Sequence, residues 1–132
     1  MGLLTPKPRV LVIEDDVRIR RAVRMVLERE GYEVREAGSG QVAVDLWREE
    51  ESDLVISDIH MPDKDGIQAM LELRALRPDL PIIAMSGSGE ITSQALLAEA
   101  KLFGPTRTLD KPFKLVELVA CVAALLPAHP PR

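Results

Sequence analysis

Short apolar runs alternate with longer amphipathic segments along most of the chain. The runs have the length of strands, and the longer segments repeat apolar residues at steps of three and four, which is the period of a helix. Strands are predicted at residues 10–13, 32–36, 53–58, 81–85 and 107–109. Helices are predicted at residues 17–30, over a segment that includes residues 42–47, and at residues 66–76, 92–103 and 114–126.

Capping residues stand where the helices are expected to begin and end. Asp16 can cap the first helix and Ser39 the second, because side chains of these types accept hydrogen bonds from the first turn. Gly31 follows the first helix as a stop signal. The last helix, 114–126, is apolar over more than half of its circumference, which indicates an additional contact surface.

Five consecutive strand–helix units indicate an α/β fold: a doubly wound parallel sheet of five strands with five flanking helices and right-handed crossovers. The chain of 132 residues has room for one domain. We place that domain at residues 9–126. Residues 1–8 are predicted to be an N-terminal tail, and residues 127–132 a C-terminal tail or the start of a linker.

Composition narrows the function classes. Hydrophobic residues make up 46% and charged residues 29%, which is typical of a globular protein, and the net charge of −4 argues against broad binding to nucleic acid or anionic membrane. We therefore expect a protein partner. No apolar stretch is long enough to span a membrane, and the single cysteine, Cys121, is interpreted as a core residue, so a cytoplasmic location is expected.

Chemically active side chains stand at the carboxyl ends of four predicted strands, where parallel sheets bind ligands. They are Glu14 and Asp15 after the first strand, Asp58 after the third, Ser86 after the fourth and Lys111 after the fifth. Each residue alone has an ordinary explanation as a cap, a strand end or a surface charge. Their convergence from separate strands favours a common site.

Mg²⁺ and phosphate fit these side chains. Mg²⁺ prefers carboxylate oxygens and water, so Asp15 and Asp58 are candidate ligands, with Glu14 acting through a water and His60 through its backbone carbonyl. Asp58 is the candidate nucleophile for a phosphoryl group. Lys111, the Ser86 hydroxyl and the Gly87 N–H are the candidate phosphate contacts.

These residues resemble the receiver domain of two-component response regulators, especially the single-domain regulators of chemotaxis. The resemblance covers residues 9–126 and rests on four motifs: Val12-Ile13-Glu14-Asp15-Asp16, Asp58 with Met61-Pro62 and Asp65-Gly66, Met85-Ser86-Gly87, and Lys111-Pro112-Phe113. It implies a flavodoxin-like sheet of order 2-1-3-4-5 and a cis bond before Pro112. It also implies that Asp58 accepts a phosphoryl group, with Mg²⁺, from a phosphohistidine on a sensor histidine kinase or a histidine phosphotransfer protein. The domain then signals to a downstream protein and is not itself a turnover enzyme.

The same resemblance points to one departure. In the family the hydroxyl of the Ser86 type moves toward the phosphoryl group, and an aromatic residue on the fifth strand rotates with it; here that position holds Thr108. We hypothesise that rearrangement of residues 86–92 carries more of the signal. His60 and Ser88 are expected to tune the lifetime of the aspartyl phosphate, and a homodimer through the face of the fourth helix, fifth strand and fifth helix is one arrangement that the family allows.

Two alternatives remain open. The domain can be part of a hybrid histidine kinase or another multidomain regulator, although no DNA-binding segment follows residue 126, so direct control of transcription by this chain is not expected. A Mg²⁺-dependent phosphatase with an aspartyl-phosphate intermediate would share the nucleophile. Such enzymes usually carry a second acid two residues further on, where this chain has His60.

Overall fold

The computed structural model describes residues 7–59, 65–87 and 106–126. The strands are β1 (Arg9–Ile13), β2 (Glu33–Ala37), β3 (Leu54–Asp58), β4 (Ile82–Gly87) and β5 (Thr106–Lys111). The helices within the described ranges are α1 (Val17–Arg29), α2 (Gly40–Glu49), α3 (Asp65–Leu76) and α5 (Leu115–Leu125). The helix predicted at residues 92–103 lies outside the described residues.

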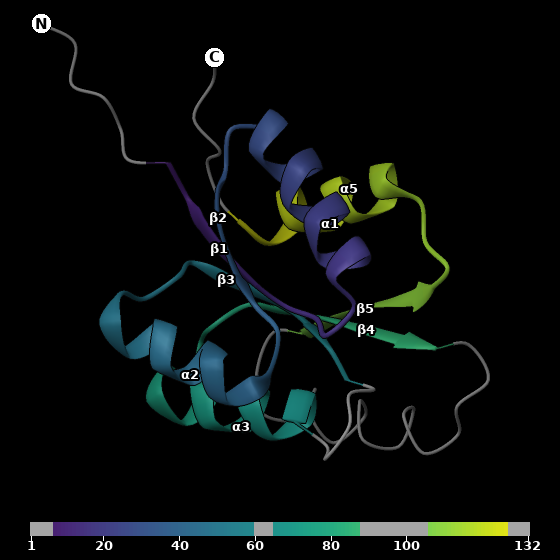
Figure 1. The fold of residues 1–132 in the computed structure, drawn as a ribbon. Helices are drawn as coiled ribbons and strands as arrows, with labels where there is room; N and C mark the ends of the chain where they lie inside the picture. Colours follow the sequence, from purple (N-terminus) through teal and green to yellow (C-terminus); the bar gives the residue numbers. More distant parts are fainter. Residues whose placement is uncertain (1–6, 60–64, 88–105, 127–132) are drawn as a thin grey trace, which may run out of the picture.

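The five strands form one parallel sheet in the order β2-β1-β3-β4-β5, which confirms the predicted topology. The first strand, β1, lies second in the sheet; the chain adds β2 on one side of it and then β3, β4 and β5 on the other (Figure 1). The direction of winding therefore reverses between β1 and β3. In parallel sheets this reversal opens a crevice at the carboxyl ends of the two strands, and ligands bind there.

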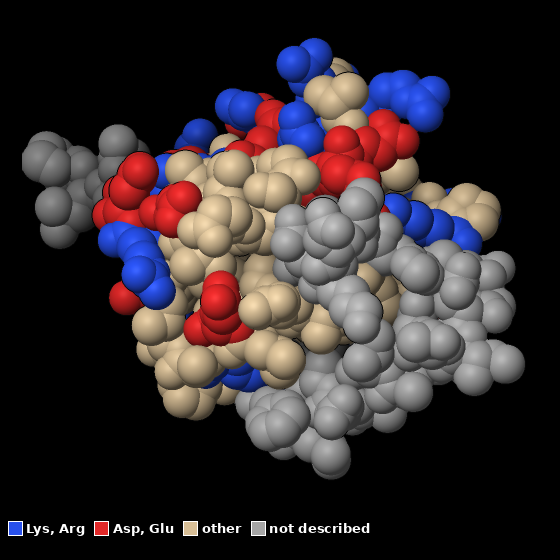
Figure 2. All heavy atoms as spheres, turned by 60° about the horizontal axis from the view of Figure 1, so that its bottom comes forward, with Lys and Arg blue, Asp and Glu red and all other residues tan. Residues whose placement is uncertain are grey.

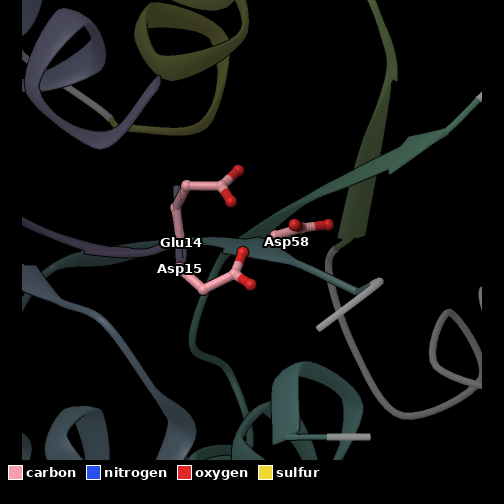
Figure 3. Close-up of side chains that lie close together, drawn as sticks. All are labelled: Glu14, Asp15 and Asp58. Carbon is pink, nitrogen blue, oxygen red and sulfur yellow. The ribbon is translucent and has the colours of Figure 1, made fainter. Parts of the chain in front are cut away.

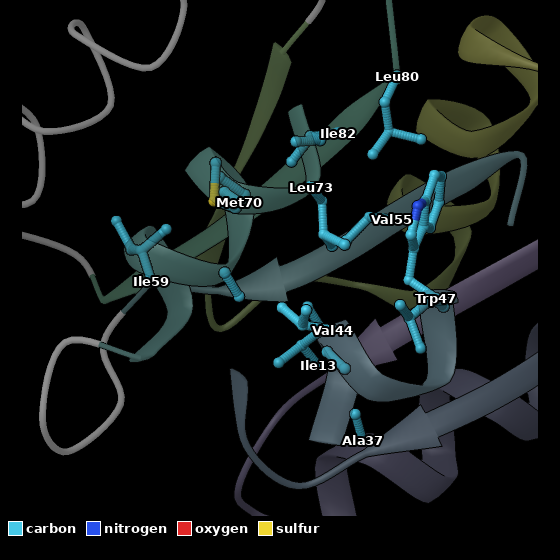
Figure 4. Packing of buried hydrophobic residues seen from close by; sticks show 14 residues of the cluster. Ile13, Ala37, Val44, Trp47, Val55, Ile59, Met70, Leu73, Leu80 and Ile82 are labelled. Carbon is cyan, nitrogen blue, oxygen red and sulfur yellow. The ribbon is translucent and has the colours of Figure 1, made fainter. Parts of the chain in front are cut away.

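Helices cover both faces of the sheet, α1 and α5 on one and α2 and α3 on the other (Figure 1). One core cluster lies between the sheet and the pair α2 and α3, with Trp47, Met70 and Leu73 among its members (Figure 4). A second cluster on the opposite face includes Val23, Leu118 and Val122 from α1 and α5. Every residue of β3 is buried, which explains why its apolar run is continuous rather than alternating.

The predicted capping residues of α1 and α2 and the stop signal after α1 are confirmed. The Asp16 side chain accepts a hydrogen bond from the backbone N–H of Arg18 at the start of α1, and Ser39 accepts one from Val42 at the start of α2. Gly31, after α1, has a φ of 95°, in the left-handed region that glycine adopts at no steric cost. Local sequence signals thus set where these helices begin and where α1 ends.

Helix α5 buries only part of its apolar circumference. Leu118 and Val122 are fully buried, whereas Val116 is 69% exposed and Leu115 is 40% exposed. Cys121, predicted as a core residue, is half-buried and packs against the edge of the second cluster. The broad apolar surface predicted for this helix is therefore present on the described molecule.

Charged side chains of both signs are interspersed on the face shown in Figure 2. The described residues on that face present no continuous basic area, in keeping with the net charge of −4. Among the described residues, no helix has both the length and the apolar character needed to cross a membrane.

Candidate functional site

Three carboxylates meet at the point where the sheet reverses its winding. Glu14 and Asp15 directly follow β1, and Asp58 is the last residue of β3. Ile13 pairs with Ser57 across these two strands, which brings the carboxylates together. One ligand oxygen from each residue lies within 4.8 Å of those from the other two (Figure 3). Glu14 and Asp58 are 1% and 3% exposed, whereas Asp15 is open to solvent.

Lys111 reaches this acidic cluster from the end of β5. Its Nζ lies 2.8 Å from Oε1 of Glu14 and 3.1 Å from Oδ2 of Asp58. Burial lowers the pKa of Lys111, but the bonds to Glu14 and Asp58 outweigh burial, and the net pKa lies above the ordinary value. The ammonium group therefore remains charged and partly neutralises the two buried acids. The peptide bond between Lys111 and Pro112 is cis, as the family resemblance implied.

Glu14 holds its proton more tightly than an ordinary glutamate. Burial raises its pKa to about 7, against the lowering effect of its bonds from Lys111 Nζ and from the backbone N–H of Asp16; the charge of Asp58 adds to the rise. Once Glu14 is ionised, the two buried carboxylates and the single ammonium between them carry a net negative charge. A divalent cation would relieve that excess.

Arg20 fixes the backbone at the acidic cluster, a role that the sequence did not reveal. Its Nη1 donates to the carbonyl oxygen of Glu14 at 2.8 Å, and its Nε donates to Glu36 on β2, also at 2.8 Å. Arg24 donates to the second oxygen of Glu36, and this bond is the main cause of the lowered pKa of that carboxyl. Neither arginine stands out in the sequence, because both fit the solvent-facing positions of an amphipathic helix.

Ser86 lies at the end of β4 and is 3% exposed. Its Oγ donates to Oδ1 of Asp110 at 3.2 Å. Ser86 and Asp110 face each other in the register of β4 and β5, so the contact follows directly from strand pairing. Asp110 does not stand out in the sequence as a site residue. Its position next to Lys111 was the only available signal.

The remaining predicted residues have mixed outcomes. Gly87 is the last residue of β4 and follows Ser86, and the contact of its N–H with a phosphoryl group stays a prediction. Thr108 lies on β5 opposite Ala84 and is partly exposed. Its place on the fifth strand is confirmed, while its signalling role stays a prediction. His60 and Ser88 lie outside the described residues.

Gly66 at the start of α3 explains part of the Asp65-Gly66 motif. A Cβ added at Gly66 would overlap the backbone carbonyl oxygen of Asp58 and would lie 3.1 Å from the Cα of Ile59. Helix α3 therefore approaches the end of β3 more closely than any other residue type allows. This contact fixes the backbone that carries Asp58.

Together the described residues provide a cluster of carboxylate oxygens for a hard cation, a buried carboxylate held next to an ammonium group, and a hydroxyl at the neighbouring strand end. This combination suits transfer of a phosphoryl group to a carboxylate, where positioning and charge neutralisation supply most of the catalysis.

Comparison with known proteins finds relatives that match most of this chain. The DNA-binding transcriptional regulator NtrC of Bradyrhizobium is 37% identical over 124 residues, which is 92% of this chain and 25% of NtrC. The transcriptional regulatory protein ResD of Bacillus subtilis is 38% identical over 122 residues, which is 92% of this chain and 49% of ResD. The chain thus spans a quarter of one relative and about half of the other.

Solved structures share the fold. The chemotaxis protein CheY4 of Vibrio cholerae matches with a TM-score of 0.81 and 28% identity, over 92% of this chain and 100% of that protein. The response regulator receiver domain family matches residues 10–123. With the strand order and the acidic cluster in place, this match shows that the chain belongs to the response regulator receiver domain family.

Proposed function

We propose that Asp58 accepts a phosphoryl group from a phosphohistidine donor and that the domain then signals by protein contact. The observation that carries the proposal is the double contact of Lys111 with Asp58 and Glu14, inside a cluster of three carboxylates. A structural ion pair would need only one acid. A second buried acid beside it favours a site built to hold a cation and a phosphoryl group.

The carboxylate cluster fits Mg²⁺, which receiver domains generally bind. All the donors are hard oxygen atoms, and the excess of negative charge in the cluster favours a divalent ion. Asp15 and Asp58 would bind it directly and Glu14 through a water, with the His60 carbonyl as the fourth predicted contact. When bound, Mg²⁺ supplies positive charge that offsets the negative oxygens of the transferring group.

The side chains of this chain then have distinct tasks. A carboxylate oxygen of Asp58 forms a bond to phosphorus, while the bond between phosphorus and the donor imidazole breaks and its electron pair stays on the imidazole nitrogen. The Lys111 ammonium stabilises negative charge on the phosphoryl oxygens, and the Ser86 hydroxyl and the Gly87 N–H donate hydrogen bonds to them.

The expected partners are those of a two-component system: a sensor histidine kinase or histidine phosphotransfer protein as donor, and a downstream protein as target. We propose a cytoplasmic location, output through protein rather than nucleic acid, and no turnover of small phosphate esters. The exposed apolar side chains of α5 support a contact surface on that helix, whether for a target or for a second copy.

Incubation with acetyl phosphate and Mg²⁺, followed by intact-mass measurement, tests the proposal. Wild type should gain one phosphoryl group and Asp58→Asn none, because the amide is a poor nucleophile. Asp45→Asn, a matched change at an exposed position of α2, should behave as wild type. An adduct on Asp58→Asn, or none on wild type, would refute the assignment of Asp58.

A second candidate is the same domain within a multidomain regulator, because NtrC and ResD are longer than the part that this chain matches. The size of the endogenous protein, measured with an antibody raised against this domain, separates the two. A band at 14.6 kDa favours a stand-alone regulator, and a larger band favours the multidomain form.

A further inference from the structure

Ser86 has one hydroxyl proton, and in this structure that proton is donated to Asp110. We propose that Asp110 is a positioning residue that holds the Ser86 hydroxyl in the unphosphorylated protein and competes with the phosphoryl group for it. The inference rests on the proposed function of Asp58 and adds a side chain that sets how readily the phosphorylated state forms.

The geometry gives the contact a definite direction. An ionised carboxylate only accepts hydrogen bonds, so Ser86 must be the donor. Ser86 is almost fully buried at the end of β4, and strand register places Asp110 directly opposite it. The oxygens are 3.2 Å apart, which is long for a bond of this kind and consistent with one that can be exchanged.

Competition follows from the single proton. To donate to a phosphoryl oxygen on Asp58, the hydroxyl of Ser86 must first leave Asp110. The Asp110 side chain is exposed, so water replaces the lost donor and the release is not prohibitive. The resting contact therefore shifts the balance away from the phosphorylated arrangement by about the net value of one hydrogen bond.

Release also changes the connection between two strands. In the unphosphorylated protein the contact joins the side chains of β4 and β5, and Asp110 lies two residues after Thr108. Loss of the contact would free the Asp110 side chain on β5. In the family, β5 is also the strand that usually carries the aromatic switch residue. In this chain the Ser86–Asp110 hydrogen bond, two residues along β5 from the small Thr108, would break when Asp58 is phosphorylated.

Binding of beryllofluoride, a phosphoryl mimic, in the presence of Mg²⁺ tests the inference through a double-mutant cycle. One net hydrogen bond corresponds to a change of about three- to ten-fold in an equilibrium constant, so Asp110→Ala should bind the mimic tighter than wild type by about that factor. Ser86→Ala should bind more weakly. In the Ser86→Ala background, Asp110→Ala should have no further effect, because the proton at issue is gone.

The cycle separates competition from simple charge repulsion. If Asp110 only repelled the anion, Asp110→Ala would tighten binding equally with and without Ser86, and the inference would be wrong. Asp110→Asn keeps an acceptor oxygen and should fall between wild type and Asp110→Ala. Unchanged or weaker binding by Asp110→Ala would likewise overturn the inference. Urea unfolding of each variant checks that the fold is intact.

Failure of the proposed function would look different. Wild type would then bind no beryllofluoride, or Asp58→Asn would bind it equally well, and this inference would fall with it. Asp45→Ala, an exposed acid on α2 far along the chain from both strands, should leave the dissociation constant unchanged.

Discussion

Glu14 and Lys111 show how burial and pairing oppose each other within one site. The Glu14 carboxyl is 1% exposed and the Lys111 side chain 23%, so both lose hydration, yet each gains the other as a partner. For Lys111 pairing prevails and its pKa rises; for Glu14 burial prevails and its pKa rises to about 7. The difference arises because the ammonium contacts two acids, while Glu14 also faces the negative charge of Asp58.

The raised pKa of Glu14 predicts a pH-dependent stability for the metal-free protein. Its pKa rises from 4.5 in the unfolded chain to about 7 in the fold, so the folded state binds more protons between these values. The free energy of unfolding should therefore fall as the pH rises from about 4.5 to 7, by about 2–3 kcal/mol from this group. Urea unfolding with EDTA at pH 5 and pH 8 measures the fall.

Glu14→Gln isolates the contribution. The amide does not titrate, so the difference in unfolding free energy between pH 5 and pH 8 should be smaller in this variant than in wild type. Lys111 does not interfere, because its raised pKa lies above this window. A pH dependence that is the same in both proteins would contradict the assignment of a buried, proton-binding Glu14.

Among the secondary-structure elements, every strand end lies within two residues of its predicted position, and the prediction for β5 was the least complete. The apolar pattern predicted 107–109, whereas β5 spans Thr106–Lys111. The three additional residues adopt strand conformation because each pairs with a residue of β4: Thr106 with Ile82, Asp110 with Ser86 and Lys111 with Gly87. Pairing across a sheet can extend a strand into polar residues, and a single-sequence pattern does not contain that information.

The residues of the candidate site likewise fall into those that the sequence could identify and those that it could not. Glu14, Asp15, Asp58, Ser86 and Lys111 could be selected because strand ends of a parallel sheet converge. Asp110 and Arg20 could not, because their roles depend on a facing residue and on a backbone carbonyl that only the folded chain brings near. Sequence thus identifies the side chains that suit the chemistry more readily than those that hold them in place.

The close approach of α3 to β3 predicts an unusual effect of alanine. In most helices a change from glycine to alanine stabilises the helix, but at Gly66 the new Cβ would overlap the backbone carbonyl of Asp58. Gly66→Ala should therefore destabilise the protein by about 1–3 kcal/mol and slow phosphorylation, because the end of β3 must shift. Urea unfolding and the rate of adduct formation from acetyl phosphate measure the two effects.

Gln68→Ala, at an exposed position of the same helix, is the matched control and should change the unfolding free energy by no more than about 0.5 kcal/mol. If Gly66→Ala were as stable as the control, the close approach of helix and strand would be incorrect.

At the scale of the whole molecule, the sheet separates two apolar clusters that share no residues. Neighbouring residues of a strand point to opposite faces, so Ile82 belongs to one cluster and Ile83 to the other. The site lies at the edge where both layers end. Its geometry therefore depends on the packing of both faces.

This separation predicts additive effects of core substitutions. Ile13→Val changes the cluster under α2 and α3, and Ile83→Val the cluster under α1 and α5, on strands that are not adjacent. Each should cost about 0.5–1.5 kcal/mol. The double variant should show their sum within about 0.5 kcal/mol, with a single unfolding transition in urea. A coupling larger than this would mean that strain passes through the sheet from one layer to the other.

The large sequence separation between Lys111 and the acids that it contacts matters while the protein is being synthesised. Lys111 meets Asp58 from 53 positions away in the chain and Glu14 from 97. A polypeptide still on the ribosome, or cut before β5, contains the nucleophile without the ammonium beside it. Under the proposed function we therefore expect efficient phosphorylation of Asp58 only after β5 has joined the sheet, and a chain that ends before β5 should accept a phosphoryl group far more slowly.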